Sequence, residues 1–290
     1  MKIKIEGHSG CNVEVVRENG RLLVYKYSTT PETGKRLWKQ AAKQSCFLSS
    51  PHIHDVNAPA VLRRIDESEK YGMVMEFIHA RNFIDFFENS ACSAPEVFAE
   101  KIIEFLEWEF SRSPLRPVSN EVLVEKFESV KKTIHAVPMF RSDREITSLL
   151  EYAEKIFARE CERVWPQGVC HGDLTLSNIL FRNSTIYLID FLDSFVETPL
   201  MDLVKLRQDT RYGWSLLLCR EPFDQVKIKI ILSFLDQHLW SHFHNFPGVA
   251  DGYHELQFMN FLRILQYARE PEIVSFLKDR MARLLAETTI

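Results

Sequence analysis

The spacing of hydrophobic and polar positions divides the chain into a strand-rich first part and a helix-rich remainder. Alternation of apolar and polar residues predicts short strands over residues 2–6, 13–16, 22–27, 61–65 and 72–78. Asn19-Gly20 lies between two of these strands and predicts a hairpin, because a type I′ turn needs positive φ at both central residues. One helix is expected over residues 33–48, where apolar positions recur every three or four residues.

After residue 78 the pattern becomes mainly helical. Apolar positions with a period near 3.6 predict helices over residues 94–112, 119–135, 142–164, 199–219, 222–244 and 253–287. A β-rich stretch at 179–191 interrupts this series. The expected fold is therefore α+β and two-lobed. A small antiparallel sheet forms a β-rich lobe over residues 1–79, and a larger helical lobe follows over residues 80–290, with a hinge near 79–82.

Composition excludes several classes of function. Hydrophobic residues make up 46% and charged residues 26% of the 290 residues, the balance of an ordinary globular protein. The net charge of −4 gives no electrostatic indication of a nucleic-acid partner or an anionic membrane. The six cysteines show no metal-ligand spacing, and no apolar run is long enough to cross a bilayer. We therefore expect a cytoplasmic protein with reduced thiols, no nucleic-acid partner and no membrane partner.

The strongest chemical signal is a run of polar residues before and after a predicted β-hairpin. His171-Gly172-Asp173 is followed, after four residues, by Asn178 and then by two β-rich runs, and Asp190 ends the second run. The two strands of a hairpin run in opposite directions, so the residues before the first strand and after the second lie at the same end. Asp173, Asn178 and Asp190 should therefore lie together at one edge of the hairpin.

This set of residues suits phosphoryl transfer. One carboxylate can orient an attacking hydroxyl and accept its proton, while an amide and a second carboxylate hold Mg²⁺ against the phosphate oxygens. Asp and Asn also form helix caps and turns without any chemistry, so an ordinary loop is the alternative interpretation. The spacing of Asp173, Asn178 and Asp190 favours the functional interpretation.

Residues 170–203 resemble the aminoglycoside phosphotransferase and choline kinase branch of the protein-kinase-like fold. That branch carries His-Gly-Asp, then Asn, then Ile-Asp-Phe or Ile-Asp-Trp. The resemblance implies that Asp173 is the catalytic base, that Asn178 and Asp190 are magnesium ligands, and that ATP and Mg²⁺ are the cofactors. Asp202 matches a Pro-x-x-Asp-Leu element that orders the loop.

The same resemblance assigns nucleotide-binding roles in the first lobe. Gly7, Ser9 and Gly10 lie between two predicted strands, where glycine lets backbone amides approach the phosphates closely. Taken alone, such a sequence is also common in plain turns.

Further nucleotide contacts are expected on the later strands of this lobe. Lys26 is implied as the ligand of the α- and β-phosphates, and Val24, two residues earlier on the same face, would cover the adenine. Backbone groups of Glu76 and Ile78 would lie beside the adenine ring. The alternative for Lys26 is a solvated lysine on a strand.

One feature departs from the kinase pattern. Kinase-like folds pair the nucleotide-binding lysine with a Glu of the following helix, but residues 33–48 contain no acid. Gln40 or Gln44 could supply a neutral amide oxygen to Lys26 instead. A nucleotide-binding pseudokinase or regulatory scaffold without turnover therefore stays open as the alternative function.

The acceptor is expected to be a small molecule. Only eight residues separate Asp190 from Pro199, too few for the peptide-docking segment of protein kinases. Sugars, polyols and amino alcohols all remain open, as do related reactions such as protein phosphorylation and nucleotidyl transfer. Candidate acceptor-binding residues are Asp193, Arg207, Asp209 and Arg211, whose alternative role is a salt-bridged helix surface.

Overall fold

The computed structural model describes residues 2–6, 11–49, 53–67 and 69–288. The chain forms two compact units. The first contains residues up to 105 together with 171–193, and the second contains 106–170 and the residues from 194 onward. The division falls inside helix α3 (Ala94–Ser111). The lobe boundary expected after residue 79 stays a prediction.

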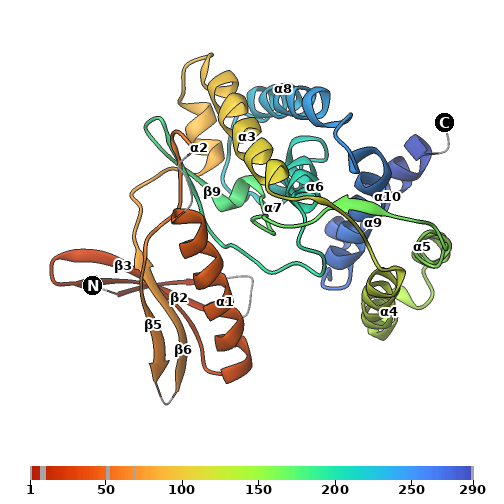
Figure 1. The fold of residues 1–290 in the computed structure, drawn as a ribbon, viewed down its shortest axis with the longest axis horizontal. Helices are drawn as coiled ribbons and strands as arrows, with labels where there is room; N and C mark the ends of the chain where they lie inside the picture. Colours follow the sequence, from red (N-terminus) through yellow and green to blue (C-terminus); the bar gives the residue numbers. More distant parts are fainter. Residues whose placement is uncertain (1, 7–10, 50–52, 68, 289–290) are drawn as a thin grey trace. The chain divides into compact units, whose positions relative to one another are not determined.

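A five-stranded antiparallel sheet dominates the first unit, with helix α1 (Pro31–Leu48) running along it (Figure 1). Asn19 and Gly20 have φ values of 49° and 80°, which confirms the predicted hairpin turn. The strand order is β1-β2-β3-β6-β5. The strands are β1 (Lys2–Glu6), β2 (Asn12–Glu18), β3 (Arg21–Ser28), β5 (Val61–Glu67) and β6 (Lys70–Glu76).

Alternation along β3 builds two hydrophobic layers, one on each face of the sheet. Leu23 and Tyr27 pack with Ile65 and Val74 on one face. The other face carries a cluster that includes α1 residues, and Val24 packs against it; its buried members are Cys11, Leu37, Ala41, Met73 and Met75. Because side chains on a strand alternate, Lys26 shares the α1-facing side with Val24.

The predicted hairpin near residue 180 is present and belongs to the first unit. Strands β9 (Ile179–Arg182) and β10 (Thr185–Leu188) pair antiparallel, and the two-residue strand β4 (Val56–Asn57) pairs with β10 in parallel. Phe181 of β9 is buried and stacks on Phe86 of helix α2 (Phe83–Glu88) at 4.2 Å. This aromatic packing fixes the hairpin that leads into and out of the candidate site.

The second unit is mainly helical, with a short two-stranded sheet. Helices α6 and α9 pack against each other at its centre, because nearly every residue of α6 and most residues of α9 are buried. Its elements after α3 are β7 (Leu115–Pro117), α4 (Asn120–Ala136), η1 (Pro138–Phe140), α5 (Arg144–Phe157), β8 (Val164–Pro166), α6 (Pro199–Thr210), α7 (Trp214–Leu218), α8 (Gln225–Phe243), α9 (Val249–Leu265) and α10 (Pro271–Thr288). The predicted α+β class, a small antiparallel sheet with a larger helical part, is confirmed.

Three predicted helices were too long. The helix expected over 142–164 ends at Phe157, because residues 164–166 form β8 and pair with β7. The helix expected over 199–219 breaks at Gly213, whose φ of 76° is left-handed. The helix expected over 253–287 is two helices, and Pro271 begins the second, where its missing N–H costs nothing.

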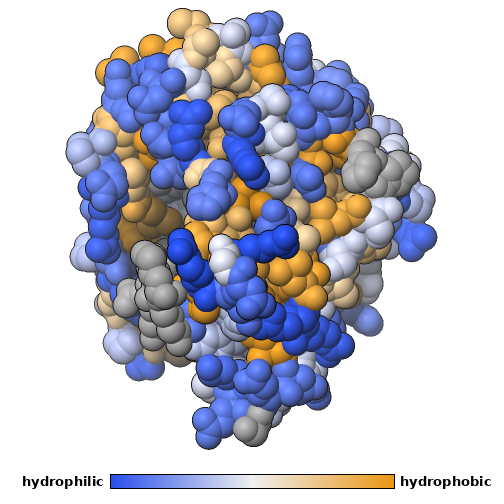
Figure 2. Space-filling view, turned by 90° about the vertical axis from the view of Figure 1, so that its left-hand side faces the viewer, coloured by the Kyte–Doolittle hydropathy of each residue, from blue (hydrophilic) through white to orange (hydrophobic). Residues whose placement is uncertain are grey.

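Within the part of the chain that the structure describes, no helix combines the length and apolar character required to span a bilayer. Figure 2 shows one face of the molecule, where hydrophilic residues predominate and hydrophobic residues are exposed in smaller areas between them.

Close packing of β3 against β6 requires a glycine at residue 72. A Cβ atom at Gly72 would lie 2.1 Å from the backbone oxygen of Lys26 and 2.7 Å from the Cα of Tyr27. The Gly72 oxygen also accepts a hydrogen bond from Trp38 Nε1 at 3.0 Å. Any side chain here would therefore push apart the two strands that position Lys26.

We expect Gly72→Ala to lower the free energy of unfolding by about 3 kcal/mol, the upper end of the usual cost of overpacking, because the Cβ would meet backbone atoms that cannot move aside. Gly20→Ala is the matched control, because Gly20 has positive φ but open space around it. Its cost should be the backbone strain alone, about 1–2 kcal/mol. Chemical denaturation measures both. An equal or smaller loss for Gly72→Ala would contradict the steric argument.

Candidate functional site

The candidate catalytic turn, His171-Gly172-Asp173, is in close contact with the segment that follows Asp190. Gly172 has a φ of 90°, and a Cβ atom there would lie 2.0 Å from the backbone oxygen of Leu192. The Leu192 N–H donates to the His171 oxygen at 2.9 Å. Glycine is therefore required at residue 172 both by its backbone conformation and by the close approach of a carbonyl. The contact aligns the turn with the segment that carries Asp190.

His171 is buried and links the turn to the strand end before Asp190. Its Nδ1 accepts from the Asp173 backbone N–H at 3.2 Å, so Nδ1 carries no proton, and Nε2–H donates to the Ile189 oxygen at 2.9 Å. Burial lowers the pKa of His171 from 6.5 to about 4, because the charged ring would lose its hydration. The ring is therefore neutral at physiological pH and acts as a bridge within the turn.

Asn178 links the candidate catalytic turn to the β9–β10 hairpin. Its Nδ2 donates to the Asp173 backbone oxygen at 2.8 Å and to Asp173 Oδ2 at 3.0 Å. Its backbone oxygen accepts from the Ile189 N–H at 3.0 Å. Asn178 therefore contacts the Asp173 carboxylate directly and the residue before Asp190. The sequence prediction that Asp173, Asn178 and Asp190 lie close together is confirmed, whereas their chemical roles stay predictions.

Asp190 has an unusual backbone conformation and a cationic partner. Its φ is 62°, a region that non-glycine residues seldom adopt and that occurs often at functional sites. Asp190 Oδ1 lies 2.7 Å from Lys26 Nζ. The Lys26 side chain is 3% exposed and that of Asp190 is 41% exposed. The pair therefore places a buried ammonium beside a carboxylate that solvent and ligands can reach.

The neutral partner of Lys26 is Gln40. Lys26 Nζ donates to Gln40 Oε1 at 3.3 Å. Gln44 instead points its amide elsewhere, because its Nε2 donates to the Pro59 oxygen at 2.5 Å. Of the two alternatives that the sequence left open, Gln40 is the residue that contacts Lys26. The buried lysine is thus held by one carboxylate and one amide.

The donor set suits a magnesium ion held partly by a substrate. Among the described residues, no group of three or more His, Cys, Asp and Glu is arranged to hold a metal. Mg²⁺ usually takes one or two protein carboxylates and completes its octahedron with waters and phosphate oxygens. Asp190, with the amide oxygen of Asn178, fits that requirement.

The predicted nucleotide-binding residues are only partly placed. Val24 packs against the α1-facing core, on the same side of β3 as Lys26. The Glu76 N–H donates to the Ala60 oxygen at 2.9 Å, and Ile78 is buried just after β6 ends. The expected strand over 72–78 thus stops at residue 76. The predicted phosphate-covering residues lie outside the described part of the chain; they are Gly7, Ser9 and Gly10.

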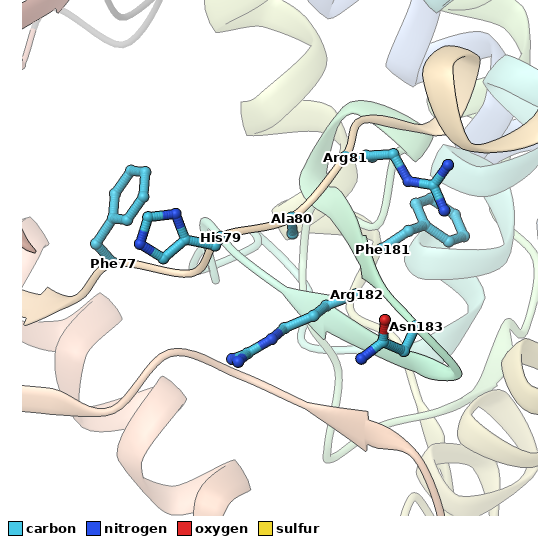
Figure 3. A pocket seen from close by; sticks show the side chains of 7 residues that line it. All are labelled: Phe77, His79, Ala80, Arg81, Phe181, Arg182 and Asn183. Carbon is cyan, nitrogen blue, oxygen red and sulfur yellow. The ribbon is translucent and has the colours of Figure 1, made fainter. Parts of the chain in front are cut away.

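An open cavity of about 380 Å³ lies beside the segment that follows β6 (Figure 3). Reciprocal backbone hydrogen bonds of 2.9 Å join Arg81 to Phe181 at this point, so the segment after β6 is attached to the hairpin. The cavity is lined by Phe77, His79, Ala80, Arg81, Phe181, Arg182 and Asn183. None of the residues predicted from the sequence to bind a ligand lines it.

Of the four candidate acceptor-binding residues, only Asp193 belongs to the first unit. It is exposed and lies three residues beyond Asp190, and its Oδ2 is 3.7 Å from Lys39 Nζ. This placement keeps Asp193 available to a ligand near the candidate site.

The other three candidates make structural contacts inside the second unit. Arg207 is buried, forms two hydrogen bonds with Asp236 and lies over the Trp240 ring at 4.0 Å. Asp209 is buried and accepts from the N–H and the hydroxyl of Ser215. Arg211 forms an ion pair with Glu287 at 2.7 Å. These contacts agree with the salt-bridged alternative, so Arg207, Asp209 and Arg211 are not carried into the proposed site.

Lys43 of α1 was missed by the sequence analysis. Its Nζ donates to the Leu192 oxygen at 2.7 Å, two residues beyond Asp190. The available signal was its position three residues after Gln40, which puts both side chains toward the same side of α1. Nothing in the sequence marked the backbone oxygen that it contacts.

Comparison with known proteins gives a consistent result. A family model described as the phosphotransferase enzyme family matches residues 6–225. A search of curated proteins found no match.

Solved structures that resemble the chain include aminoglycoside phosphotransferases and a glucosamine kinase. An apo form of aminoglycoside phosphotransferase APH(4)-Ia is 12% identical, with a TM-score of 0.65, and the match covers 99% of this chain and 94% of that one. A GDP complex of an aminoglycoside 2′-phosphotransferase-IIIa variant is 13% identical, with a TM-score of 0.63 and coverage of 100% and 92%. A glucosamine kinase is 13% identical, with a TM-score of 0.57 and coverage of 94% and 75%.

The structural likeness establishes the kinase-like fold, and the family model covers well over half of the sequence, including the whole catalytic turn and hairpin. The chain therefore belongs to the phosphotransferase enzyme family.

Proposed function

We propose that the protein transfers the γ-phosphate of ATP to a hydroxyl group of a small molecule. The observation that carries this proposal is the contact set around the hairpin, in which Asn178 contacts Asp173 and Lys26 contacts Asp190. One backbone framework thus carries a carboxylate that could accept a proton, two side chains that could offer oxygens to a metal, and a buried cation that could bind phosphates. These are the groups that phosphoryl transfer requires.

Each residue has a distinct role in this mechanism. Asp173 would orient the acceptor hydroxyl and accept its proton as the oxygen attacks the γ-phosphorus, while the bond from that phosphorus to the bridging oxygen breaks and ADP leaves. Asn178 and Asp190 would hold Mg²⁺, which supplies charge neutralisation at the phosphate oxygens. Lys26 would donate hydrogen bonds to the α- and β-phosphates. Because Asn178 also fixes the Asp173 side chain, the base and the metal site are positioned together.

Two observations support the proposed class of acceptor. Residues 191–198, between Asp190 and α6, contain no helix or strand and are too few to dock a peptide. Similar structures include complexes of aminoglycoside phosphotransferases with hygromycin B or kanamycin, and a glucosamine kinase. We therefore propose a sugar, a polyol or an amino alcohol as the acceptor. The similar structures also contain ADP, AMP-PNP or GDP, which supports a purine nucleotide as the donor.

A second candidate is nucleotide binding without turnover. Gln40 favours it, because a neutral amide holds Lys26 less strongly than the carboxylate found in active kinases. Asp190 compensates in part, since it supplies a charged partner at 2.7 Å. A screen of alcohols, sugars and amino alcohols for ADP release, run beside a thermal-shift titration with Mg·ATP, separates the two. Binding without ADP release for any acceptor would favour the second candidate.

Asp173→Asn should lower kcat by at least about a hundredfold while Mg·AMP-PNP still binds, because the amide cannot accept the hydroxyl proton. Asp190→Asn should instead weaken metal-dependent nucleotide binding, since it removes the charged metal ligand. Calorimetry with and without Mg²⁺ and a coupled assay for ADP measure both effects. Asp224→Asn, at an exposed helix cap of the second unit, is a control for the loss of a carboxylate. Full turnover by Asp173→Asn would rule out the assigned base.

The neutral His171 bridge makes stability depend on pH. An unfolded histidine has a pKa near 6.5, whereas the folded value is about 4, so the unfolded chain binds an additional proton between these values. The contribution of the buried neutral ring is therefore fully present above pH 6.5 and is lost as the pH falls towards 4. Protonation would also abolish the acceptor at Nδ1 and release the Asp173 backbone.

We expect His171→Gln to reduce the loss of stability between pH 6.5 and 4 by an amount on the order of 3 kcal/mol. The glutamine amide can accept and donate as the ring does, but it does not titrate in this range. Urea unfolding at several pH values measures the difference in slope, and His238→Gln at an exposed position is the control. Parallel pH profiles for the wild type and His171→Gln would contradict the neutral bridge.

A further inference from the structure

The charges on α1 are the reverse of those expected for the helix that positions a nucleotide-binding lysine. Glu32, in the first turn, is the single acid of α1. The basic residues of the helix are Lys35, Arg36, Lys39 and Lys43. None of these basic residues can form an ion pair with Lys26, and the contact of Lys26 with the helix is the Gln40 amide. Its lysines can instead donate hydrogen bonds to a backbone carbonyl of the segment that carries Asp190.

Lys43 makes such a contact. Its Nζ donates to the Leu192 oxygen at 2.7 Å, and its side chain is partly buried. The Leu192 peptide is held on its other side as well, because its N–H donates to the His171 oxygen. Lys43 Nζ also lies 3.3 Å from the point that a Gly172 Cβ would occupy. The ammonium therefore lies where the catalytic turn and the Asp190 segment meet.

We propose that Lys43 is a positioning residue of the phosphotransfer site, which fixes the Asp190 segment and the Asp173 turn to α1 in place of the missing Glu. The inference rests on the proposed function for its catalytic consequence, but its structural part does not. Gln40 then has a minor role. The link between α1 and the Asp190 segment then depends on a lysine–carbonyl bond and is independent of the charge of Lys26.

Two further observations support this assignment. An ammonium hydrogen bond to a carbonyl is charge-assisted, and partial burial protects it from competing water. The nearby charge of Lys43 also helps to keep the pKa of His171 low, which favours the neutral bridge. By contrast, the neighbouring Lys39–Asp193 pair is 3.7 Å long, with 71% and 49% of the side chains exposed, so it contributes little.

Lys43→Met tests the proposal, because it removes the ammonium and keeps most of the apolar stem. Lys35→Met, an exposed position two turns earlier on α1, is the matched control. We expect Lys43→Met to speed amide exchange at Leu192 by about tenfold, the effect of losing one charge-assisted bond. We also expect kcat to fall by up to about a hundredfold with a smaller change in nucleotide KM, as for a misplaced catalytic group. Lys43→Arg should restore much of both, since a guanidinium can reach the same carbonyl.

Hydrogen exchange of residues 189–193, measured by mass spectrometry with and without Mg·AMP-PNP, gives a readout that requires no acceptor. If Lys43→Met exchanges like the wild type and like Lys35→Met, the anchor does not exist and the proposal is wrong. If Lys43→Met does not fold, Lys43→Gln provides the same comparison with a neutral donor. A wild type without turnover would remove the proposed function, yet selective loosening of residues 189–193 in Lys43→Met would still support the anchor.

Discussion

The candidate site depends on the close approach of the Leu192 carbonyl to Gly172. Only a residue without a Cβ atom permits this contact, and the backbone of Gly172 is in a conformation that other residues rarely adopt. The approach brings the Leu192 N–H to the His171 oxygen and the His171 ring to the Ile189 oxygen. Asp173 and Asp190 are distant in sequence, yet one set of short backbone contacts determines their separation. The side chains of the site are thus positioned by the turn and the hairpin rather than by their own packing.

The neutral state of His171 follows from the same constraint. A buried ring that accepts from one backbone N–H and donates to one carbonyl must carry a single proton. A charged ring would leave the Asp173 N–H without its acceptor, which is why burial and hydrogen bonding act together here. His171, two residues before the proposed base Asp173, therefore contributes order to the site through these backbone contacts.

The sequence predicted the fold class, the five strands of the first sheet, the later hairpin and the grouping of Asp173, Asn178 and Asp190, but not the short strands β4, β7 and β8. The predicted features follow from local rules, because alternation, turn residues and a hairpin are all set by neighbours in the chain. It could not distinguish Gln40 from Gln44, since both lie on the buried side of α1 and only the packing shows which one contacts Lys26. The role of Lys43 was inaccessible for a related reason, because its partner is a backbone oxygen and no residue type identifies such a group.

Arg207 and Asp209 lie in a polar run that left two interpretations open, a ligand surface or a salt-bridged helix. Nearly every residue of α6 is buried, so its polar side chains must find partners within the protein. The Asp236 carboxylate is such a partner for Arg207, and Ser215 is one for Asp209. Charge in a sequence segment therefore indicates a binding surface only where the segment is exposed, and exposure depends on packing that local patterns do not report.

The pairing of Lys26 with Asp190 has a consequence for how ligands would enter the proposed site. In the structure, Asp190 Oδ1 serves as the charged partner of Lys26, yet the same carboxylate is the proposed metal ligand. A metal at Asp190 would compete with the ammonium for that oxygen and would leave Lys26 with Gln40, a weaker partner. A buried ammonium without a full counter-charge is costly, and nucleotide phosphates would supply that charge. Metal and nucleotide should therefore bind with positive coupling, and a helix anchored independently by Lys43 would hold the framework unchanged while Lys26 exchanges one anion for another.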